Sequence, residues 1–242
     1  MRIAISGAGR MGKTTFVNDF LKNWPNYKTP ESKNTYRSLI EEDKHSQKTD
    51  GKVQWKVLNK LIDQVQGYSR EDNVIHDRCP LDNLVYTMWA YEKGNKGCDA
   101  NLLERTIPLV KESMRFLDIV FVITTSPANK IVLRESDTKK DLKYLEEVDV
   151  IFKELFARYQ KDGCFAFFPK NDSPAVIDLH GNPEERIAMA KLYVTPEGGT
   201  YGEDQAIFNP QELLQMEDLL KQQKEALDQE NKEKDLYKKF GL

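Results

Sequence analysis

One short motif near the start of the chain limits the folds that are open to it. Residues 7–14 read Gly-Ala-Gly-Arg-Met-Gly-Lys-Thr and fit the pattern G-x-x-x-x-G-K-[ST]. The apolar run of residues 2–6 before the motif suits a buried strand. After the motif, Phe16, Phe20 and Trp24 recur every four residues, as on one face of a helix. A glycine-rich loop between a strand and a helix is typical of nucleoside triphosphate binding, because glycines let backbone N–H groups close around phosphate oxygens.

The residues of this loop are expected to share the contacts to ATP and Mg²⁺. Gly7, Gly9 and Gly12 allow the backbone to approach the phosphates, and the next helix points its N-terminus at them. Lys13 binds ATP and also has a catalytic role, because its charge lies on the β- and γ-phosphates. Thr14 offers a hydroxyl to Mg²⁺, and Thr15 reaches the α-phosphate.

Strands and helices alternate along most of the chain. Besides residues 2–6, apolar runs at 73–77, 118–124 and 175–179 predict strands, and a further short strand is possible near 27–29. Helical patterns lie at 53–65, 82–93, 101–116, 141–160 and 183–193. This alternation predicts an α/β fold, a three-layer sandwich of the P-loop NTPase type with a mostly parallel sheet of about five strands. A C-terminal helical extension follows.

The composition changes near residue 195. A glycine-containing linker at 196–202 leads into a charged, glutamine-rich helix, whose thin apolar stripe holds Leu213, Met216 and Leu220. We therefore predict a P-loop kinase-like domain at 1–195 and a linker with a charged helix at 196–242. Two interpretations of that helix stay open: it packs loosely or projects into solvent, or it docks on a partner.

A second motif, residues 74–82, reads Val-Ile-His-Asp-Arg-Cys-Pro-Leu-Asp. Asp77 falls at the carboxyl end of a predicted strand, where ligands bind in open α/β sheets. There its carboxylate can hold Mg²⁺ through a water, accept a proton as a general base, or do both. Arg78 has a planar donor group that matches phosphate oxygens. The alternative is a simple ion pair between Asp77 and Arg78 at the end of the strand.

Taken together, these motifs resemble the deoxynucleoside kinase and thymidylate kinase branch of the P-loop kinases, and especially its NadR-like ATPase/kinase relatives. The resemblance covers residues 1–195. It rests on the loop at 7–14, on Asp-Arg-Cys-Pro-Leu-Asp-Asn-Leu-Val-Tyr at 77–86, and on Asp-Leu-Lys-Tyr-Leu-Glu at 141–146. It implies that Asp77 activates the acceptor hydroxyl, that Arg78 clamps a phosphate or the acceptor, and that both are catalytic.

The same resemblance implies a lid between the strand at 118–124 and the helix at 141–160. Arg134 is the candidate for a catalytic lid arginine, with Lys139 and Lys140 as competitors. The sequence departs from the family here, because the lid has one arginine where several are usual. The acceptor pocket of the family maps to a further set of candidate substrate-binding residues: Glu31, Gln54, Arg78, Asp82 and Tyr86.

Three functions remain possible. The first is an ATP-dependent kinase that transfers the γ-phosphate of ATP to a nucleoside or nucleotide. The second is a DNA kinase that phosphorylates 5-hydroxymethyl pyrimidine bases in viral DNA. The third is a non-catalytic, nucleotide-gated binding module. A GTPase is disfavoured, because Asn129-Lys130-Ile131-Val132 lacks the aspartate of the guanine-reading N-K-x-D segment.

Charge and cysteine content bear on the partners and the compartment. Lys and Arg number 36 against 39 Asp and Glu, a net charge of −3, which argues against coating nucleic acid by bulk charge. No apolar stretch approaches the ~20 residues of a membrane span. Three cysteines without a CxxC pair fit a reducing cytoplasm. We expect a nucleoside or nucleotide partner and no membrane partner. DNA bases as acceptor and a homodimer stay open as alternatives.

Overall fold

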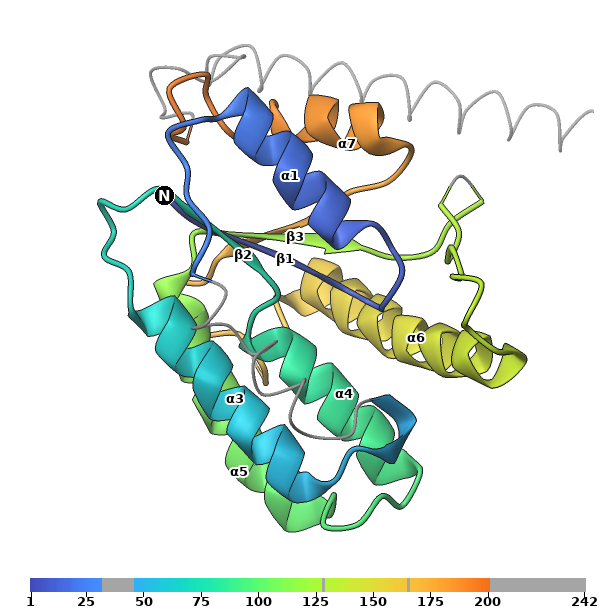
Figure 1. Cartoon of the computed structure of the whole chain (residues 1–242). Coiled ribbons are helices and arrows are strands. Elements are labelled where there is room, and N and C mark those ends of the chain that lie inside the picture. Colours follow the sequence, from blue (N-terminus) through green and yellow to red (C-terminus); the bar gives the residue numbers. More distant parts are fainter. Residues whose placement is uncertain (32–45, 128, 165, 201–242) are drawn as a thin grey trace, which may run out of the picture. The chain divides into compact units, whose positions relative to one another are not determined.

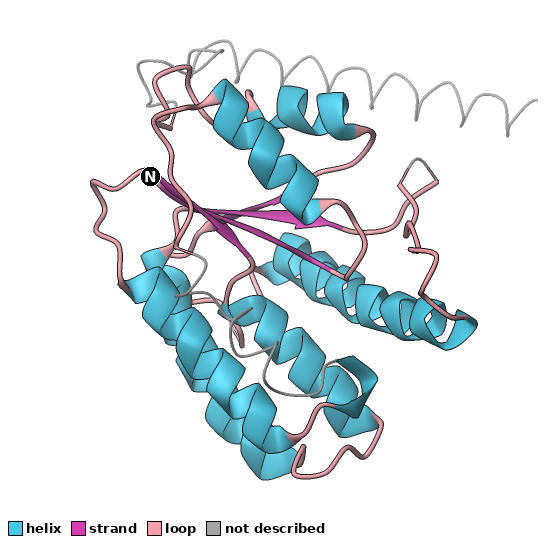
Figure 2. Ribbon diagram, viewed as in Figure 1, coloured by secondary structure: helices cyan, strands magenta, loops and turns pink. Residues whose placement is uncertain are grey.

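A computed structural model gives the fold and describes residues 1–31, 46–127, 129–164 and 166–200. Candidate residues outside these ranges, including the apolar stripe of the C-terminal helix, therefore have no structural counterpart here. The elements alternate as the sequence predicts (Figures 1 and 2). In chain order they are β1 (Arg2–Gly7), α1 (Lys13–Asn23), η2 (Ser46–Lys48), α3 (Gly51–Gln66), β2 (Val74–Asp77), α4 (Pro80–Glu92), α5 (Ala100–Ser113), η3 (Met114–Phe116), β3 (Ile119–Ile123), α6 (Lys139–Asp162), β4 (Ala175–Asp178) and α7 (Pro183–Ala190).

The sheet is parallel throughout its described part, with the strand order β2-β1-β3-β4. The strands lie where the sequence predicts them. About five were expected, and the structure describes four; the possible strand near 27–29 is a single parallel bridge between Lys28 and Val74. α1 and α7 cover one face, and α4 and α6 cover the other (Figure 1). The three-layer α/β sandwich is therefore confirmed.

Aromatic side chains join α1 to the sheet. Phe16 meets Phe121 of β3 edge to face, with ring centroids 5.6 Å apart. One helical turn on, Phe20 stacks on Trp24 at 4.3 Å and meets Tyr27 edge to face at 5.0 Å. All five rings are buried, and burial of each apolar side chain contributes about 1.5–3 kcal/mol to folding. This packing fixes the helix whose first turn borders the glycine-rich loop.

The compact unit that contains the sheet runs from Met1 to Gly199. Its last residues are hydrogen-bonded to the chain that follows α1. The indole Nε1 of Trp24 donates to the carbonyl of Thr195 at 2.7 Å, and the hydroxyl of Tyr27 donates to the carbonyl of Gly198 at 2.7 Å. The boundary predicted at residue 195 lies four residues before the end of this unit. Among the described helices, none is long and apolar enough to cross a membrane.

Candidate active site

Glycine is required at two points of the loop between β1 and α1. Gly7 has a φ of 137°, and a Cβ at this position would lie 2.2 Å from the carbonyl oxygen of Ile123. Gly12 has a φ of 81° and forms the N-cap of α1. Both conformations are accessible to glycine at low cost. The loop therefore passes against β3 and turns its backbone toward the start of α1, as a phosphate-binding loop must.

Lys13 is buried at the first position of α1. Its Nζ donates to the carbonyl of Gly7 at 2.8 Å and also to the carbonyl of Ala8. The ammonium group therefore lies inside the curve of the loop, at the place from which a lysine reaches bound phosphates. Its contact to ATP and its catalytic role remain predictions.

Thr14 and Asp77 come together, although 63 residues separate them in the sequence. The hydroxyl of Thr14 donates to Oδ2 of Asp77 at 2.8 Å. The sheet explains the meeting, because Asp77 is paired in register with Ile5 at the same end of the adjacent strand. A hydroxyl and a carboxylate side by side are oxygen ligands of the kind that Mg²⁺ prefers. The two residues predicted as metal ligands thus share one location.

Arg78 turns away from the strand with a positive φ of 92°. Its Nη1 donates to Oδ1 of Asp82 at 2.8 Å, and its Nη2 donates to the hydroxyl of Tyr86 at 3.2 Å. The guanidinium also lies over the Tyr86 ring, 5.1 Å from its centre. Three of the predicted substrate-binding residues therefore form one group at the start of α4. Arg78 and Asp82 also form a salt bridge.

Asp82 is buried and connects two segments of the site. Its Oδ2 accepts from the hydroxyl of Ser6 at 2.7 Å and from the backbone N–H of Cys79 at 3.1 Å, and its Oδ1 accepts from the N–H of Gly7 at 3.4 Å. With the contact to Arg78, one carboxylate joins the end of β1 to the start of α4. These bonds show that Asp82 stabilises the local structure. Its role in substrate binding remains a prediction.

Gln54, another predicted acceptor residue, is buried between helices α3 and α4. Its Nε2 donates to the hydroxyl of Thr49 at 2.8 Å, and its Oε1 accepts from Nδ2 of Asn83 at 2.8 Å. Glu31 is exposed and is the last described residue before the gap at 32–45. The roles of Gln54 and Glu31 in substrate binding remain predictions.

A salt bridge between the loop and the predicted lid was missed by the sequence reasoning. Nε and Nη2 of Arg10 donate to the two carboxylate oxygens of Asp137 at 2.8 and 2.9 Å. The backbone N–H of Arg134 donates to the same carboxylate at 2.8 Å. The hydrogen bond from Arg10, together with the N–H of Arg134, lowers the pKa of Asp137 to about 2. The side chain of Arg134 is exposed, and its catalytic role remains a prediction.

A pocket of about 620 Å³ borders the loop. Small-molecule sites commonly measure about 300–1,000 Å³. Its walls come from the loop and the start of α1, from the segment after β3, and from the turn that begins α7; they include Arg10, Gly12, Thr15, Lys130 and Arg186. Thr15, predicted to contact ATP, therefore faces this pocket.

Arg186 is a further residue that the sequence reasoning missed. It is buried, and its Nη1 donates to the carbonyl of Met11 at 3.0 Å, while its Nη2 donates to Oδ1 of Asn129. Burial lowers the pKa of its guanidinium. Arg186 thus ties α7 to the back of the loop and to the segment after β3. A single arginine on an amphipathic helix gives no sequence signal for such a task.

Comparison with known proteins supports the fold. No family model and no curated protein matches the sequence. The structure resembles deoxyadenosine kinase from M. mycoides with bound dATP, with 22% identity, a TM-score of 0.53 and coverage of 79% of this chain and 98% of that one. It also resembles a NadR protein in complex with NR, with 16% identity, a TM-score of 0.51 and coverage of 74% of this chain and 45% of that one. The chain thus spans less than half of the NadR protein. These likenesses show that the chain has the fold of the P-loop kinases, as the motifs predicted.

Proposed function

We propose that this protein is an ATP-dependent kinase that transfers the γ-phosphate of ATP to a nucleoside or nucleotide. The observation that carries the proposal is the 2.8 Å hydrogen bond between the Thr14 hydroxyl and Asp77. It joins the loop that suits a triphosphate to the carboxylate that suits a metal or an acceptor hydroxyl. The likeness in fold to deoxyadenosine kinase supports the same activity.

The residues of the donor side fit ATP and Mg²⁺. The loop, Lys13 and the N-terminus of α1 suit the phosphates, and the pocket of about 620 Å³ beside Thr15 and Arg186 has room for the base and sugar. In the described residues no cluster of three or more His, Cys, Asp or Glu side chains could hold a metal. Thr14 and Asp77 would therefore hold Mg²⁺ together with phosphate oxygens and water, as is common for this ion. Bound Mg²⁺ neutralises charge on the transferred phosphoryl group.

On the acceptor side, Asp77 is the proposed base. Its carboxylate accepts the proton of the acceptor hydroxyl, so that the oxygen can attack phosphorus. Arg78 then balances the negative charge that develops, and Tyr86 holds the Arg78 guanidinium in place through the 3.2 Å hydrogen bond. The loop, Lys13 and Thr14 suit one class of donor, a nucleoside triphosphate, whereas the group around Arg78 suits several acceptors. The identity of the acceptor is therefore the first thing to measure.

The test is a panel of acceptors with ATP labelled in its γ-phosphate. The panel contains nucleosides, nucleoside monophosphates, nicotinamide riboside and DNA with 5-hydroxymethyl pyrimidines. Labelled nucleoside or nucleotide supports the proposal, and labelled DNA would favour the DNA kinase instead. ATP binding without transfer to any acceptor would favour the nucleotide-gated binding module. Asp77→Asn is the matched negative control, because asparagine keeps the size of the side chain and can still accept from Thr14.

Location and assembly follow from the same proposal. A kinase of free nucleotides works where ATP is abundant, and the cytoplasm is the expected compartment. A homodimer is also proposed, and light scattering on the full chain tests it.

A further inference from the structure

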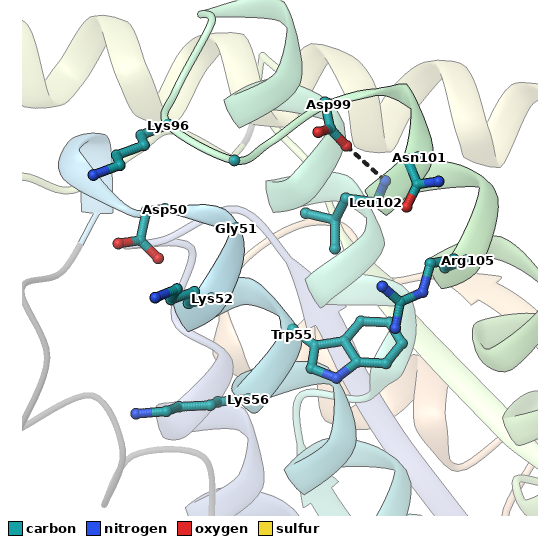
Figure 3. A pocket seen from close by; sticks show the side chains of 11 residues that line it. Asp50, Gly51, Lys52, Trp55, Lys56, Lys96, Asp99, Asn101, Leu102 and Arg105 are labelled. Atoms are coloured by element: carbon teal, nitrogen blue, oxygen red, sulfur yellow. Dashed lines mark hydrogen bonds between the residues drawn. The ribbon is translucent and has the colours of Figure 1, made fainter.

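A second hollow lies away from the candidate active site. It has a volume of about 600 Å³ and is formed by the N-terminal ends of α3 and α5 and by the turn that precedes α5 (Figure 3). None of its lining residues belongs to the glycine-rich loop, to the group around Arg78 or to the segment at 127–138. Trp55 and Gln54 are neighbours on α3, yet Gln54 bonds to α4 and Trp55 contacts Arg105 of α5. The hollow and the α3–α4 contact therefore lie on different faces of α3.

The charge around this hollow is positive. Lys52, Lys56, Lys96 and Arg105 line it. In the part of the chain that the structure describes, Lys52, Lys96 and Arg105 form no ion pair. The side chains of Lys52 and Lys96 are exposed. These cations are therefore available to an anionic ligand.

The two carboxylates of the hollow are already engaged by helix ends. Asp50 accepts from the backbone N–H of Val53 at 2.9 Å as the N-cap of α3. Asp99 accepts from the N–H of Leu102 at 2.9 Å as the N-cap of α5, and Figure 3 shows this bond. A carboxylate at a helix N-terminus is stabilised by the positive end of the helix dipole. Asp50 and Asp99 therefore offset the two helix ends, and Lys52, Lys96 and Arg105 give the hollow its positive sign.

One wall of the hollow is aromatic. Trp55 is partly exposed, and the guanidinium of Arg105 lies 4.3 Å from the centre of its ring. Figure 3 shows the indole and the guanidinium next to each other, with Lys52 and Lys56 on the same helix. Aromatic rings and Arg planes stack with the bases of unpaired nucleotides. An inorganic phosphate would use the cations but would leave the ring and most of the volume without a contact.

We propose that this hollow binds a nucleotide unit, with the base against Trp55 and Arg105 and the phosphate among Lys52, Lys56 and Lys96. The unit comes either from a single-stranded nucleic acid or from a free nucleotide, since both carry the same base and phosphate. The site is separate from the ATP loop and does not depend on the proposed kinase activity.

The test measures binding of a 5′-fluorescein-labelled twelve-residue oligothymidylate to the full-length protein by fluorescence anisotropy. The measurement is repeated with the Lys13→Ala variant, in which ATP binding is weakened but the second hollow is intact. The double variant Lys52→Glu/Lys96→Glu should weaken binding about tenfold or more, because it replaces attraction to phosphate by repulsion. Trp55→Leu should also weaken binding about tenfold, since base stacking on an aromatic ring is lost.

The matched control is Arg158→Glu/Lys161→Glu on the exposed side of α6. It changes the net charge by the same amount, and its affinity should stay within roughly twofold of the unmodified protein, because distant exposed charges are screened by salt. If Trp55→Leu does not fold, as judged by circular dichroism, the lysine variants decide the question.

Competition with unlabelled dTMP identifies the source of the nucleotide. Displacement of the oligonucleotide by micromolar dTMP supports a free nucleotide, and displacement only by unlabelled oligonucleotide supports a single strand. No binding of the labelled oligonucleotide overturns the proposal. Equal losses in the hollow and control variants also overturn it, because the attraction would then come from net charge alone.

Discussion

Arg10, in the middle of the glycine-rich loop, holds both carboxylate oxygens of Asp137 at 2.8 and 2.9 Å. These residues are 127 positions apart, and Arg10 makes the contact from a left-handed backbone conformation with a φ of 63°. The salt bridge attaches the segment before α6 to the loop that suits the phosphates. Any motion of that segment over bound ATP must therefore carry Arg10 with it or break this pair.

The first prediction concerns this pair. Arg10→Asn keeps a residue that tolerates the left-handed conformation but removes both hydrogen bonds to Asp137. We expect residues 134–141 to exchange amide hydrogens faster in the variant, and hydrogen–deuterium exchange with mass spectrometry measures this. Because the pKa of Asp137 is lowered to about 2, the pair is complete above pH ~4 and is lost only as the pH falls toward 2. Exchange rates unchanged by the substitution at pH 7 would mean that the pair does not hold the segment.

Lys13 should control the affinity for Mg-ATP. Lys13→Ala removes a buried ammonium from the curve of the loop. Charge-assisted hydrogen bonds of this kind contribute about 1.5–3 kcal/mol, which corresponds to a loss of roughly tenfold to hundredfold in affinity. Isothermal titration calorimetry measures the change, and Lys22→Ala at the exposed end of α1 is the control. Equal affinities of Lys13→Ala and the unmodified protein would rule out the phosphate-binding role of the loop.

Asp77 should matter more for turnover than for ATP binding. Asp77→Asn preserves an acceptor for the Thr14 hydroxyl but cannot take a proton. General base catalysis contributes about 10²–10⁴-fold, so kcat should fall by that factor while the Kd for ATP changes little. Steady-state kinetics with the acceptor found in the panel gives the first number and calorimetry the second. Near-native turnover would leave Asp77 as a partner of Thr14 and Mg²⁺ only.

His76 should make the stability of the protein depend on pH. It is fully buried on β2 beside Gln64, and burial, with the nearby charge of Arg2, lowers its pKa to about 3. The unfolded state therefore binds a proton below pH ~6.5 that the folded state does not bind until about pH 3, so stability falls as the pH decreases between these values. The slope approaches about 1.4 kcal/mol per pH unit.

Urea unfolding at pH 7, 6 and 5 tests this dependence. His76→Gln should flatten the slope in that range, whatever its effect on stability at pH 7. A slope that survives in His76→Gln would assign the pH dependence to other groups.

The end of the compact unit can be located by truncation. Removal of residues 200–242 should leave the melting temperature of the Met1–Gly199 unit unchanged within ~2 °C. Removal of residues 196–242 deletes the acceptors of Tyr27 and Asn26, which bond to Gly198 and Glu197. Loss of these two hydrogen bonds, from Asn26 and Tyr27, lowers the free energy of unfolding by about 1–3 kcal/mol and the melting temperature by about 2–12 °C. Equal melting curves for the two truncations would place the boundary at 195, and an insoluble shorter product would place 196–199 in the core.

The sequence indicated those parts of the candidate site whose residues lie next to one another along the chain. The strand, the loop and Lys13 are contiguous, and Asp77 ends a short apolar strand. The pairing of that strand with β1 came from the structure. The contacts of Arg10 and Arg186 were not predictable in the same way, because their partners are distant in the sequence. Arg10 pairs with the carboxylate of Asp137, and Arg186 donates to the backbone carbonyl of Met11; each partner is more than 120 positions away. An isolated charge has no period that indicates its partner.

Gln54 illustrates a different limit. Its amide can pair with a nucleotide base as well as with a neighbouring helix, and the sequence does not distinguish the two. In the structure the partners of its amide are Asn83 of α4 and Thr49, which precedes α3. Only the tertiary fold identifies these partners, and a role of Gln54 in substrate binding stays a prediction.

The shared carboxylate of Asp82 has a consequence for how this protein can change. It holds Ser6 and Gly7 next to the proposed donor site and Arg78 on the proposed acceptor side, so one side chain connects both halves of the candidate site. A substitution at Asp82 cannot change acceptor preference alone, because it also removes the hydrogen bonds that hold Ser6 and Gly7 at the proposed triphosphate site. Tyr86 belongs to the same connected group, because its hydroxyl accepts from Arg78 at 3.2 Å. New acceptor preferences would therefore have to arise beyond Tyr86 along α4.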